Sequence, residues 1–250
     1  MKTSISDNDN YPTFCEVAAT SDLFLNFRNN NTYRDILEHV SFSEGEEYLK
    51  IIKEKNPKLL NLIDKYLTND KIGNPKKFNY SIGNISPTTL RYIKVLSEII
   101  EIYGDLDNKD IVEIGCGYGG QAKIICDTFK IKSYTLIDLD SVLKLTKRYL
   151  NSFKLNINFK YLKMSDIQNK NNYDYFISNY AYTECNRDIQ MFYYNNILSR
   201  SKNGYITANF ISDIFNITSL KKDELLKLIP NYKIYEELPK THKNNIIISW

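Results

Sequence analysis

The stretch that decides the fold is Ile111-Val112-Glu113-Ile114-Gly115-Cys116-Gly117-Tyr118-Gly119-Gly120, an apolar strand pattern with one acid that leads into a glycine-rich turn. A helical pattern over residues 121–129 follows at once. A turn in this position presents backbone N–H groups and a helix N-terminus to a bound small molecule. Glycine suits it, because the tight turn requires backbone angles that a Cβ resists and a ligand can touch bare backbone. The stretch therefore predicts a cofactor cradle.

Two kinds of cofactor fit this spacing. The arrangement Gly115-x-Gly117-x-x-Gly120 satisfies the dinucleotide fingerprint. Asp138 ends a second buried strand pattern about 20 residues further on, where an acid accepts hydrogen bonds from ribose hydroxyls. Glu113 disfavours a dinucleotide, because this acid breaks the apolar run expected before a pyrophosphate-binding turn. For Asp138, capping of the next helix is the structural alternative.

The order of the elements predicts an α/β fold. Strand patterns at residues 157–162, 173–179 and 205–211 alternate with helical patterns at 140–153 and 188–200, and a helix at 222–229 is followed by strands at 232–238 and 246–250. Such alternation indicates parallel strands, right-handed crossovers and helices on both faces, with ligands at the carboxyl ends of the strands. We expect a doubly wound, mostly parallel, seven-stranded sheet.

The N-terminal region reads as mainly helical. Residues 43–55 and 57–68 are expected to form helices, the first opening in capping-box fashion at Ser43 and the second with Pro57 at its first position. Residues 69–85 read as a loop, and Ser86 with Pro87 starts a helix to about residue 103. We expect a helical cap that selects the substrate at residues 1–75 and a catalytic domain at residues 80–250.

Composition favours a cytoplasmic enzyme. The net charge is only +3, from 33 basic and 30 acidic residues, whereas nucleic-acid binding usually requires a concentrated basic face. No apolar run approaches the roughly 18 residues of a membrane span, and the polar start lacks the apolar part of a secretory signal. The four cysteines are scattered and lack metal-ligand spacing. We expect no nucleic-acid partner, no membrane span and no metal. The sequence leaves open whether the protein forms a homodimer.

Two resemblances narrow the choice of cofactor. The run of hydrophobic residue, Glu113, hydrophobic residue and three spaced glycines resembles the first motif of class I S-adenosylmethionine-dependent methyltransferases, which close their sheet with an antiparallel hairpin. A narrower resemblance is to the sugar O-methyltransferase family, and it is carried by residues 85–96, 112–121, 178–185 and 239–250. This resemblance covers about residues 80–250. It implies S-adenosylmethionine as cofactor, S-adenosylhomocysteine as product, and a sugar or nucleotide-linked sugar of surface polysaccharide biosynthesis as acceptor.

The resemblance also implies where the ligands bind. It assigns cofactor binding to Glu113, Gly115, Cys116, Gly117, Asp138, Leu139, Asp166, Ile167, Asn179 and Arg91, and substrate binding to Tyr180, Tyr182 and Asn209. Asp166 would meet the adenine amino group, and Arg91 the methionine carboxylate. The structural alternatives are turn chemistry for Asp166 and a salt bridge for Arg91.

The reaction itself requires a base. Methyl transfer to a hydroxyl is an in-line displacement that positioning accelerates, and removal of the hydroxyl proton by a general base adds roughly 10²- to 10⁴-fold. Glu184, just beyond the fourth strand, and His242, in the closing hairpin, are the predicted bases. Their structural alternatives are a carboxylate at a helix N-terminus and an exposed turn residue.

Four other functions stay open at this point. The enzyme could methylate another small molecule, or an amino group of a nucleic-acid base, although Asn179-Tyr180-Ala181-Tyr182 lacks the two prolines expected for the latter. It could be an NAD-dependent sugar-modifying enzyme, but such enzymes usually place the glycine loop near the chain start and carry a Tyr-x-x-x-Lys pair, and this chain does neither. A non-catalytic cofactor-binding subunit is the fourth.

Overall fold

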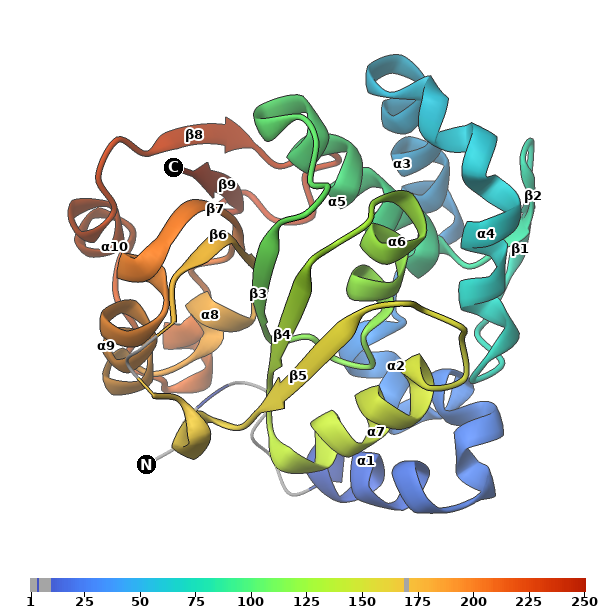
Figure 1. Cartoon of the computed structure of the whole chain (residues 1–250), viewed down its shortest axis with the longest axis horizontal. Helices are drawn as coiled ribbons and strands as arrows, with labels where there is room; N and C mark the ends of the chain where they lie inside the picture. Colours follow the sequence, from blue (N-terminus) through green and yellow to red (C-terminus); the bar gives the residue numbers. More distant parts are fainter. Residues whose placement is uncertain (1–3, 5–9, 169–170) are drawn as a thin grey trace.

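A seven-stranded sheet organises the chain in the computed structural model, which describes residues 4, 10–168 and 171–250 (Figure 1). The strand order is β5-β4-β3-β6-β7-β9-β8. Its members are β3 (Asp110–Ile114), β4 (Ser133–Ile137), β5 (Asn158–Leu162), β6 (Tyr173–Asn179), β7 (Ser201–Ala208), β8 (Lys233–Glu236) and β9 (Ile246–Ser249). The first five strands pair in parallel, and β9 is antiparallel to β7 and β8. The predicted α/β fold with its closing antiparallel hairpin is therefore confirmed.

The alternation of side chains along the strands produces two apolar cores, because successive residues point to opposite faces of a sheet. In β3, Ile111 belongs to one core and Val112 to the other. The first core is covered by α5 (Pro87–Tyr103), α6 (Gly120–Thr128) and α7 (Asp140–Leu150). The second is covered by α8 (Ala181–Glu184), α9 (Arg187–Asn196) and α10 (Lys222–Leu228). Figure 1 shows these two sets of helices on opposite sides of the sheet.

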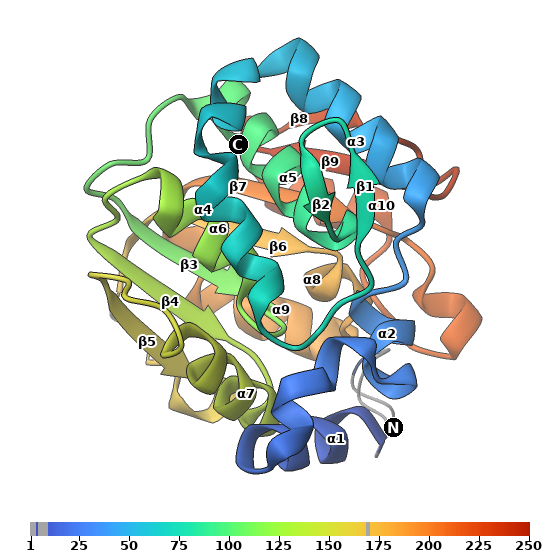
Figure 2. The ribbon, with the colours of Figure 1, turned by 90° about the vertical axis from the view of Figure 1, so that its right-hand side faces the viewer.

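The N-terminal helices extend the first core. They are α1 (Asn10–Thr20), η1 (Asp22–Asn29), α2 (Asn31–Leu37) and α3 (Phe42–Lys55), where η denotes a 3-10 helix. Helix α1 packs against α7, and α3 packs against α5. Figure 2 shows α1 beside α7 and α3 beside α5. Tyr11, Tyr48 and Ile93 accordingly belong to the same buried cluster. The N-terminal region thus shares a core with the sheet, and its proposed division from the catalytic domain remains a prediction.

The helix starts show where local signals succeed. Ser86 caps α5 as predicted, since its Oγ accepts a hydrogen bond from the Thr89 N–H at 3.2 Å. The start of α3 differs from the prediction, because the cap is Ser41 instead of Ser43. Ser41 Oγ accepts from the Glu44 N–H at 3.2 Å, and the Ser41 N–H donates to Glu44 Oε2 at 2.7 Å. The capping box is real and begins two residues earlier.

Other helices and strands begin or end at residues different from those that the local sequence pattern predicts. The helix expected at 57–68 is divided into η2 (Pro57–Leu62), α4 (Ile63–Leu67) and η3 (Thr68–Lys71), and the expected loop contains a hairpin of β1 (Phe78–Tyr80) and β2 (Gly83–Ile85). Three short 3-10 helices complete the fold: η4 (Met164–Asp166), η5 (Leu198–Arg200) and η6 (Ser212–Phe215). Strand β7 begins four residues before the apolar pattern because its polar first residues already pair with β6, starting with Ser201 against Tyr173.

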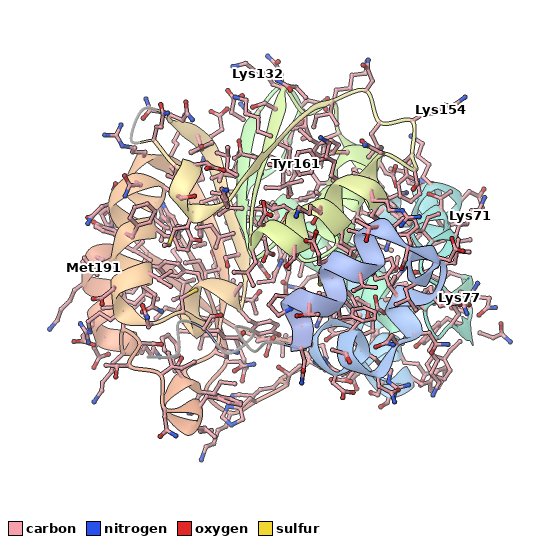
Figure 3. The ribbon with its side chains drawn as sticks, turned by 90° about the horizontal axis from the view of Figure 1, so that it is seen from below. Lys71, Lys77, Lys132, Lys154, Tyr161 and Met191 are labelled. Atoms are coloured by element: carbon pink, nitrogen blue, oxygen red, sulfur yellow. The ribbon has the colours of Figure 1, made fainter. Side chains whose placement is uncertain are left out.

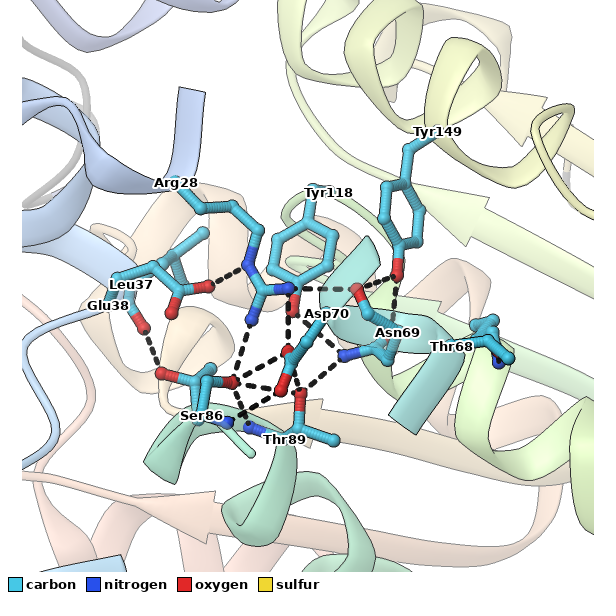
Figure 4. Close-up of polar contacts among 12 residues, drawn as sticks. Arg28, Leu37, Glu38, Thr68, Asn69, Asp70, Ser86, Thr89, Tyr118 and Tyr149 are labelled. Carbon is cyan, nitrogen blue, oxygen red and sulfur yellow. Dashed lines mark hydrogen bonds and ion pairs between the residues drawn. The ribbon is translucent and has the colours of Figure 1, made fainter. Parts of the chain in front are cut away.

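A buried polar network connects the N-terminal helices to the cradle (Figure 4). The fully buried Arg28 donates from Nε to Glu38 Oε1 at 2.5 Å and from Nη1 to Asp70 Oδ1 at 2.9 Å. Its guanidinium carbon also lies 4.7 Å from the centre of the Tyr118 ring, which belongs to the glycine turn. Because Glu38 and Asp70 are themselves buried, the guanidinium is the cation that balances both carboxylates.

The same network reaches two further helices. Asp70 accepts hydrogen bonds from the Ser86 N–H at 2.6 Å and the Thr89 hydroxyl at 2.7 Å, at the start of α5. The neighbouring Asn69 accepts from the hydroxyl of Tyr149, near the end of α7. The 3-10 turn η3 buries Asn69 and Asp70 together, so that one short turn serves both helices (Figure 4).

The surface carries its basic side chains on several elements. Figure 3 shows Lys71, Lys77, Lys132 and Lys154 projecting outward along the edge of the molecule. Lys132 forms an exposed pair with Asp110 at 2.7 Å. Within the residues that the structure describes, the helices are too short or too polar to cross a membrane.

The buried network yields a prediction about stability. Replacing Arg28 by methionine leaves Glu38 and Asp70 buried without their cation, so we expect the free energy of unfolding to fall by about 3–5 kcal/mol. Urea denaturation of wild type and variant measures this loss. The matched control is Arg187→Met, which breaks the half-exposed pair with Glu224 and should cost about 0–1 kcal/mol. Equal, small losses in both variants would contradict the assigned role of the network.

Candidate active site

The glycine turn between β3 and α6 depends on bare backbone. Gly115, Gly117 and Gly119 have φ angles of +76°, +53° and +90°, a region that side chains disfavour. A Cβ at position 115 would lie 2.0 Å from the Cβ of Ala181, and one at position 117 would lie 2.8 Å from Leu37 Cδ1. The turn therefore has the left-handed geometry that the sequence predicts, and the side chains that approach these two glycines closely are Ala181 and Leu37.

Asp138 is bound to the cradle directly. It follows β4, and its Oδ2 accepts a hydrogen bond from the Gly117 N–H at 3.0 Å while Oδ1 accepts from the Leu139 N–H at 2.8 Å. Burial raises the pKa of this carboxyl to about 6, and the two backbone N–H groups oppose the shift. A part-buried carboxylate with a displaced pKa, at the carboxyl end of a strand, is a candidate for ligand binding.

Glu113, in β3, and Cys116, in the turn itself, are both buried. Glu113 is buried in β3 and accepts a hydrogen bond from the Tyr134 hydroxyl at 2.7 Å, and burial raises its pKa to about 8. Cys116 is buried beside Thr146, and burial raises the pKa of its thiol well above the usual range. Thr146 in turn donates to the Gly117 carbonyl at 2.6 Å. Glu113 thus contacts β4 and Cys116 contacts α7, and their predicted contacts with the cofactor remain predictions.

The third strand contributes an exposed acid. Asp166 ends the 3-10 turn η4, where its Oδ1 accepts from the Ser165 hydroxyl at 3.3 Å. Ile167, next in the chain, packs partly buried against the second core, and Leu139 packs partly buried against the first. The exposed carboxylate of Asp166 and these two apolar side chains thus lie in the loops after β5 and β4. Their predicted contacts with adenine remain predictions.

The end of β6 holds strained backbone. Tyr180 has a φ of +67°, and a side chain in this region costs roughly 1–3 kcal/mol, which proteins tolerate mainly at functional sites. Its hydroxyl donates to Glu237, in the loop after β8. The preceding Asn179 accepts from the Thr207 hydroxyl at 3.1 Å. These contacts join the ends of β6, β7 and β8.

A small cavity lies at this junction. Its volume is about 20 Å³, and its lining includes Tyr48, Arg91, Lys94, Asn179, Tyr180 and Glu237. The structure therefore brings together the predicted residues Arg91, Asn179 and Tyr180. A volume of this size holds about one water molecule, so a sugar-sized ligand requires the surrounding elements to move apart.

Glu184 lies beside Asn209 in a second polar cluster. The Asn209 amide donates to Glu184 Oε1 at 2.6 Å, and Asn209 Oδ1 accepts from the Thr183 hydroxyl at 3.1 Å. Burial raises the pKa of Glu184, which the amide opposes. Thr183, Glu184 and Asn209 are close in sequence to Tyr180 and Thr207, which line the cavity, but are not themselves among its described lining residues.

Neither His242 nor Tyr182 is among the residues that line the cavity. His242 is exposed in the loop between β8 and β9, where its Nδ1 accepts from the Asn244 N–H at 3.3 Å. Tyr182 is fully buried in the second core, and its hydroxyl donates to the Gln190 carbonyl at 3.2 Å. The predicted roles of His242 as a base and of Tyr182 in substrate binding remain predictions.

Sequence reasoning missed Glu237 and Tyr48. Glu237 falls inside the strand expected at 232–238, where an acid looks like an ordinary solvent-facing residue, but β8 ends at Glu236 and Glu237 turns inward. Its only sequence signal is its position just before the segment 239–245. Tyr48 is one of several buried residues on α3, and nothing in the helical pattern separates it from the others. Among the described residues, no cluster of three or more His, Cys, Asp or Glu side chains is arranged to hold a metal ion.

The strand order and the cradle define the chain as having the class I methyltransferase fold. Solved structures with a similar fold include the N-methyltransferase NodS of Bradyrhizobium japonicum WM9 in complex with S-adenosyl-L-homocysteine, at 12% identity and a TM-score of 0.49 over 64% of this chain and 84% of that one. An S-adenosylmethionine-dependent methyltransferase of Clostridium acetobutylicum matches at 12% identity and a TM-score of 0.48, over 62% and 87% of the two chains.

A candidate sarcosine dimethylglycine methyltransferase of Galdieria sulphuraria matches at 19% identity and a TM-score of 0.46, over 59% of this chain. The match spans 65% of that protein, which is less than two thirds of its length. No protein-family model and no curated protein matches the chain. At these identities the likeness is one of fold, and the site is assigned from the residues of this chain.

The geometry of the cradle can be tested with a pair of glycines. Gly115→Ala combines a strained φ with overlap on Ala181, whereas Gly104→Ala has a similar φ of +80° with no atom within 4 Å of the new Cβ. We expect Gly104→Ala to cost about 1 kcal/mol and Gly115→Ala at least about 1 kcal/mol more. Urea denaturation measures both, and a Gly115→Ala variant no less stable than Gly104→Ala would show that the close approach is not required.

Proposed function

We propose that the protein is an S-adenosylmethionine-dependent O-methyltransferase that methylates a hydroxyl of a sugar or nucleotide-linked sugar in surface polysaccharide biosynthesis. One observation carries the proposal: the glycine turn after β3 is hydrogen-bonded to Asp138, and a cavity lined with Arg91 and Tyr180 lies at the end of the neighbouring strand β6. This arrangement supports a cofactor site and an acceptor site on the carboxyl edge of the sheet, where ligands of α/β proteins bind.

The residues of the cradle fit this cofactor. Gly115 and Gly117 have positive φ angles that glycine adopts without strain, and Asp138 offers a carboxylate to the ribose hydroxyls. Asp166 is exposed and available to the adenine amino group, and Arg91 supplies a cation for the methionine carboxylate. The cofactor, when bound, supplies an activated sulfonium methyl group. The protein then has to orient the acceptor hydroxyl and remove its proton.

The acceptor site draws on the N-terminal helices. Tyr48 of α3 lines the cavity, and the Leu37 carbonyl at the end of α2 accepts from Arg91 Nη2 at 3.3 Å. The proposed role of residues 1–75 in substrate selection is supported by these contacts. Burial raises the pKa of Tyr48 to about 12, with Arg91 opposing, so its hydroxyl is protonated at neutral pH and can donate a hydrogen bond to a sugar oxygen.

The displaced pKa of Asp138 predicts a pH dependence of cofactor binding. Ribose hydroxyls donate hydrogen bonds to the ionised carboxylate, which is lost as the pH falls through about 6. We therefore expect the affinity for S-adenosylhomocysteine to rise, by up to about tenfold, between about pH 5 and 7. Calorimetric titration at several pH values measures this. Asp138→Asn should bind more weakly and lose the pH dependence, and an unchanged slope in that variant would assign the titration to another group.

Methyl transfer itself tests the proposed function. We expect the purified protein with S-adenosylmethionine to methylate at least one member of a panel of nucleoside diphosphate hexoses, detected by mass spectrometry as a product heavier by one CH₂. The controls are reactions without acceptor and with the Asp138→Asn variant. Transfer only to amines would leave a methyltransferase but contradict the sugar acceptor. Cofactor binding without transfer to any acceptor would instead favour a non-catalytic subunit.

A further inference from the structure

Glu237 is a buried carboxylate with two unlike oxygens. Its side chain is 3% exposed. Oε2 accepts three hydrogen bonds from the hairpin that contains it: from the Thr241 N–H at 3.3 Å, the Thr241 hydroxyl at 2.7 Å and the Asn245 amide at 2.9 Å. Oε1 accepts a hydrogen bond from the Tyr180 hydroxyl. One oxygen therefore holds the hairpin together, while the other is bound to a residue of the proposed acceptor site.

Oε1 has capacity for a second donor. A carboxylate oxygen has about two lone-pair sites, and within the described part of the chain Tyr180 is the one donor to Oε1. Glu237 and Tyr180 both line the cavity at the ends of β6 and β7. An acceptor hydroxyl that enters this cavity can therefore donate to the remaining lone pair of Oε1 without displacing the hairpin contacts of Oε2.

Tyr180 acts as a donor in this pair. Burial, and then the charge of Glu237, raises the pKa of Tyr180 well above its usual value, with Arg91 opposing. The phenol therefore keeps its proton near neutral pH, so the carboxylate is the member of the pair that can take up another. The other charged groups that line the cavity are Arg91 and Lys94, and Lys94 is paired with Glu98 at 2.7 Å.

We propose that Glu237 is the general base that receives the proton of the acceptor hydroxyl, an inference that rests on the proposed function. The acceptor oxygen forms its bond to the methyl carbon as the carbon–sulfur bond breaks, and the sulfur keeps that electron pair and becomes a neutral thioether. The hydroxyl proton passes to Glu237 Oε1, which becomes a neutral carboxyl group hydrogen-bonded to Tyr180. Arg91 lines the same cavity.

The test replaces Glu237 by glutamine. The amide oxygen can keep the hydrogen bonds from Thr241 and Asn245, whereas the amide nitrogen at the position of Oε1 cannot accept a proton. The matched control is Glu236→Gln, which removes the neighbouring carboxylate, exposed and paired with Lys240 at 2.8 Å. Three quantities are measured for each variant: calorimetric affinity for S-adenosylhomocysteine, affinity of that complex for the nucleoside diphosphate hexose that the wild type methylates, and kcat.

We expect Glu237→Gln to lower kcat by about 10²- to 10⁴-fold while both affinities stay within a few-fold of wild type. Glu236→Gln should match wild type in all three. The inference is overturned if Glu237→Gln retains its kcat, or if it loses kcat together with both affinities. Glu237 would then have only the role of holding the hairpin together. If the glutamine variant does not fold, Glu237→Asp decides: its withdrawn carboxylate should lower kcat at least about tenfold with cofactor affinity retained, and an unchanged kcat overturns the inference.

These outcomes separate the inference from the function beneath it. A wild-type protein that methylates none of the hexoses contradicts the proposed function, and this inference falls with it. A wild-type protein that methylates a hexose, with a fully active Glu237→Gln variant, contradicts the inference alone.

Discussion

The buried guanidinium of Arg28 is the interaction on which the arrangement of the site depends. It neutralises Glu38 and Asp70, and it lies on the ring of Tyr118, inside the glycine turn. Removing such a cation from a buried site costs far more than removing an exposed one, because the carboxylates would remain in a poorly solvating environment. The N-terminal helices, the start of α5 and the cradle are therefore held in one fixed relation, with α2 placed over Gly117.

The cradle and the proposed acceptor cavity are formed by different elements of the fold. The cradle is made by the central strands β3 and β4, whose turns follow from glycine and one carboxylate. The cavity is made where α3, α5 and the ends of β6 and β7 meet the closing hairpin. The proposed cofactor site and the proposed acceptor site therefore depend on different elements of the fold. The strained Tyr180 lies at the boundary between the two.

The sequence was sufficient for the sheet and the cradle because their signals are local. Apolar strand patterns, the glycine spacing and the Ser86-Pro87 helix start each occupy a few consecutive residues. The Arg28 network was not predictable in this way, since its partners Asn69, Asp70 and Ser86 lie 41 to 58 residues away. Glu237 escaped for the same reason: its partner Tyr180 is 57 residues away, and an acid in an edge strand normally faces solvent.

Other differences reflect tertiary contacts that override a local pattern. The polar start of β7 became strand because β6 offers it a hydrogen-bonding partner, and the segment after Leu67 became a 3-10 turn that buries two polar residues. Tyr182, in the short helix α8, is buried in the second core, and its predicted contact with the acceptor remains a prediction.

The central claim is that the glycine cradle binds S-adenosylmethionine rather than a dinucleotide. Calorimetric titration of the purified protein with S-adenosylhomocysteine, with NAD titrated in parallel, tests it most directly. The account predicts micromolar binding of S-adenosylhomocysteine and no heat of binding with NAD. Binding of NAD alone, or of neither compound, would contradict the account.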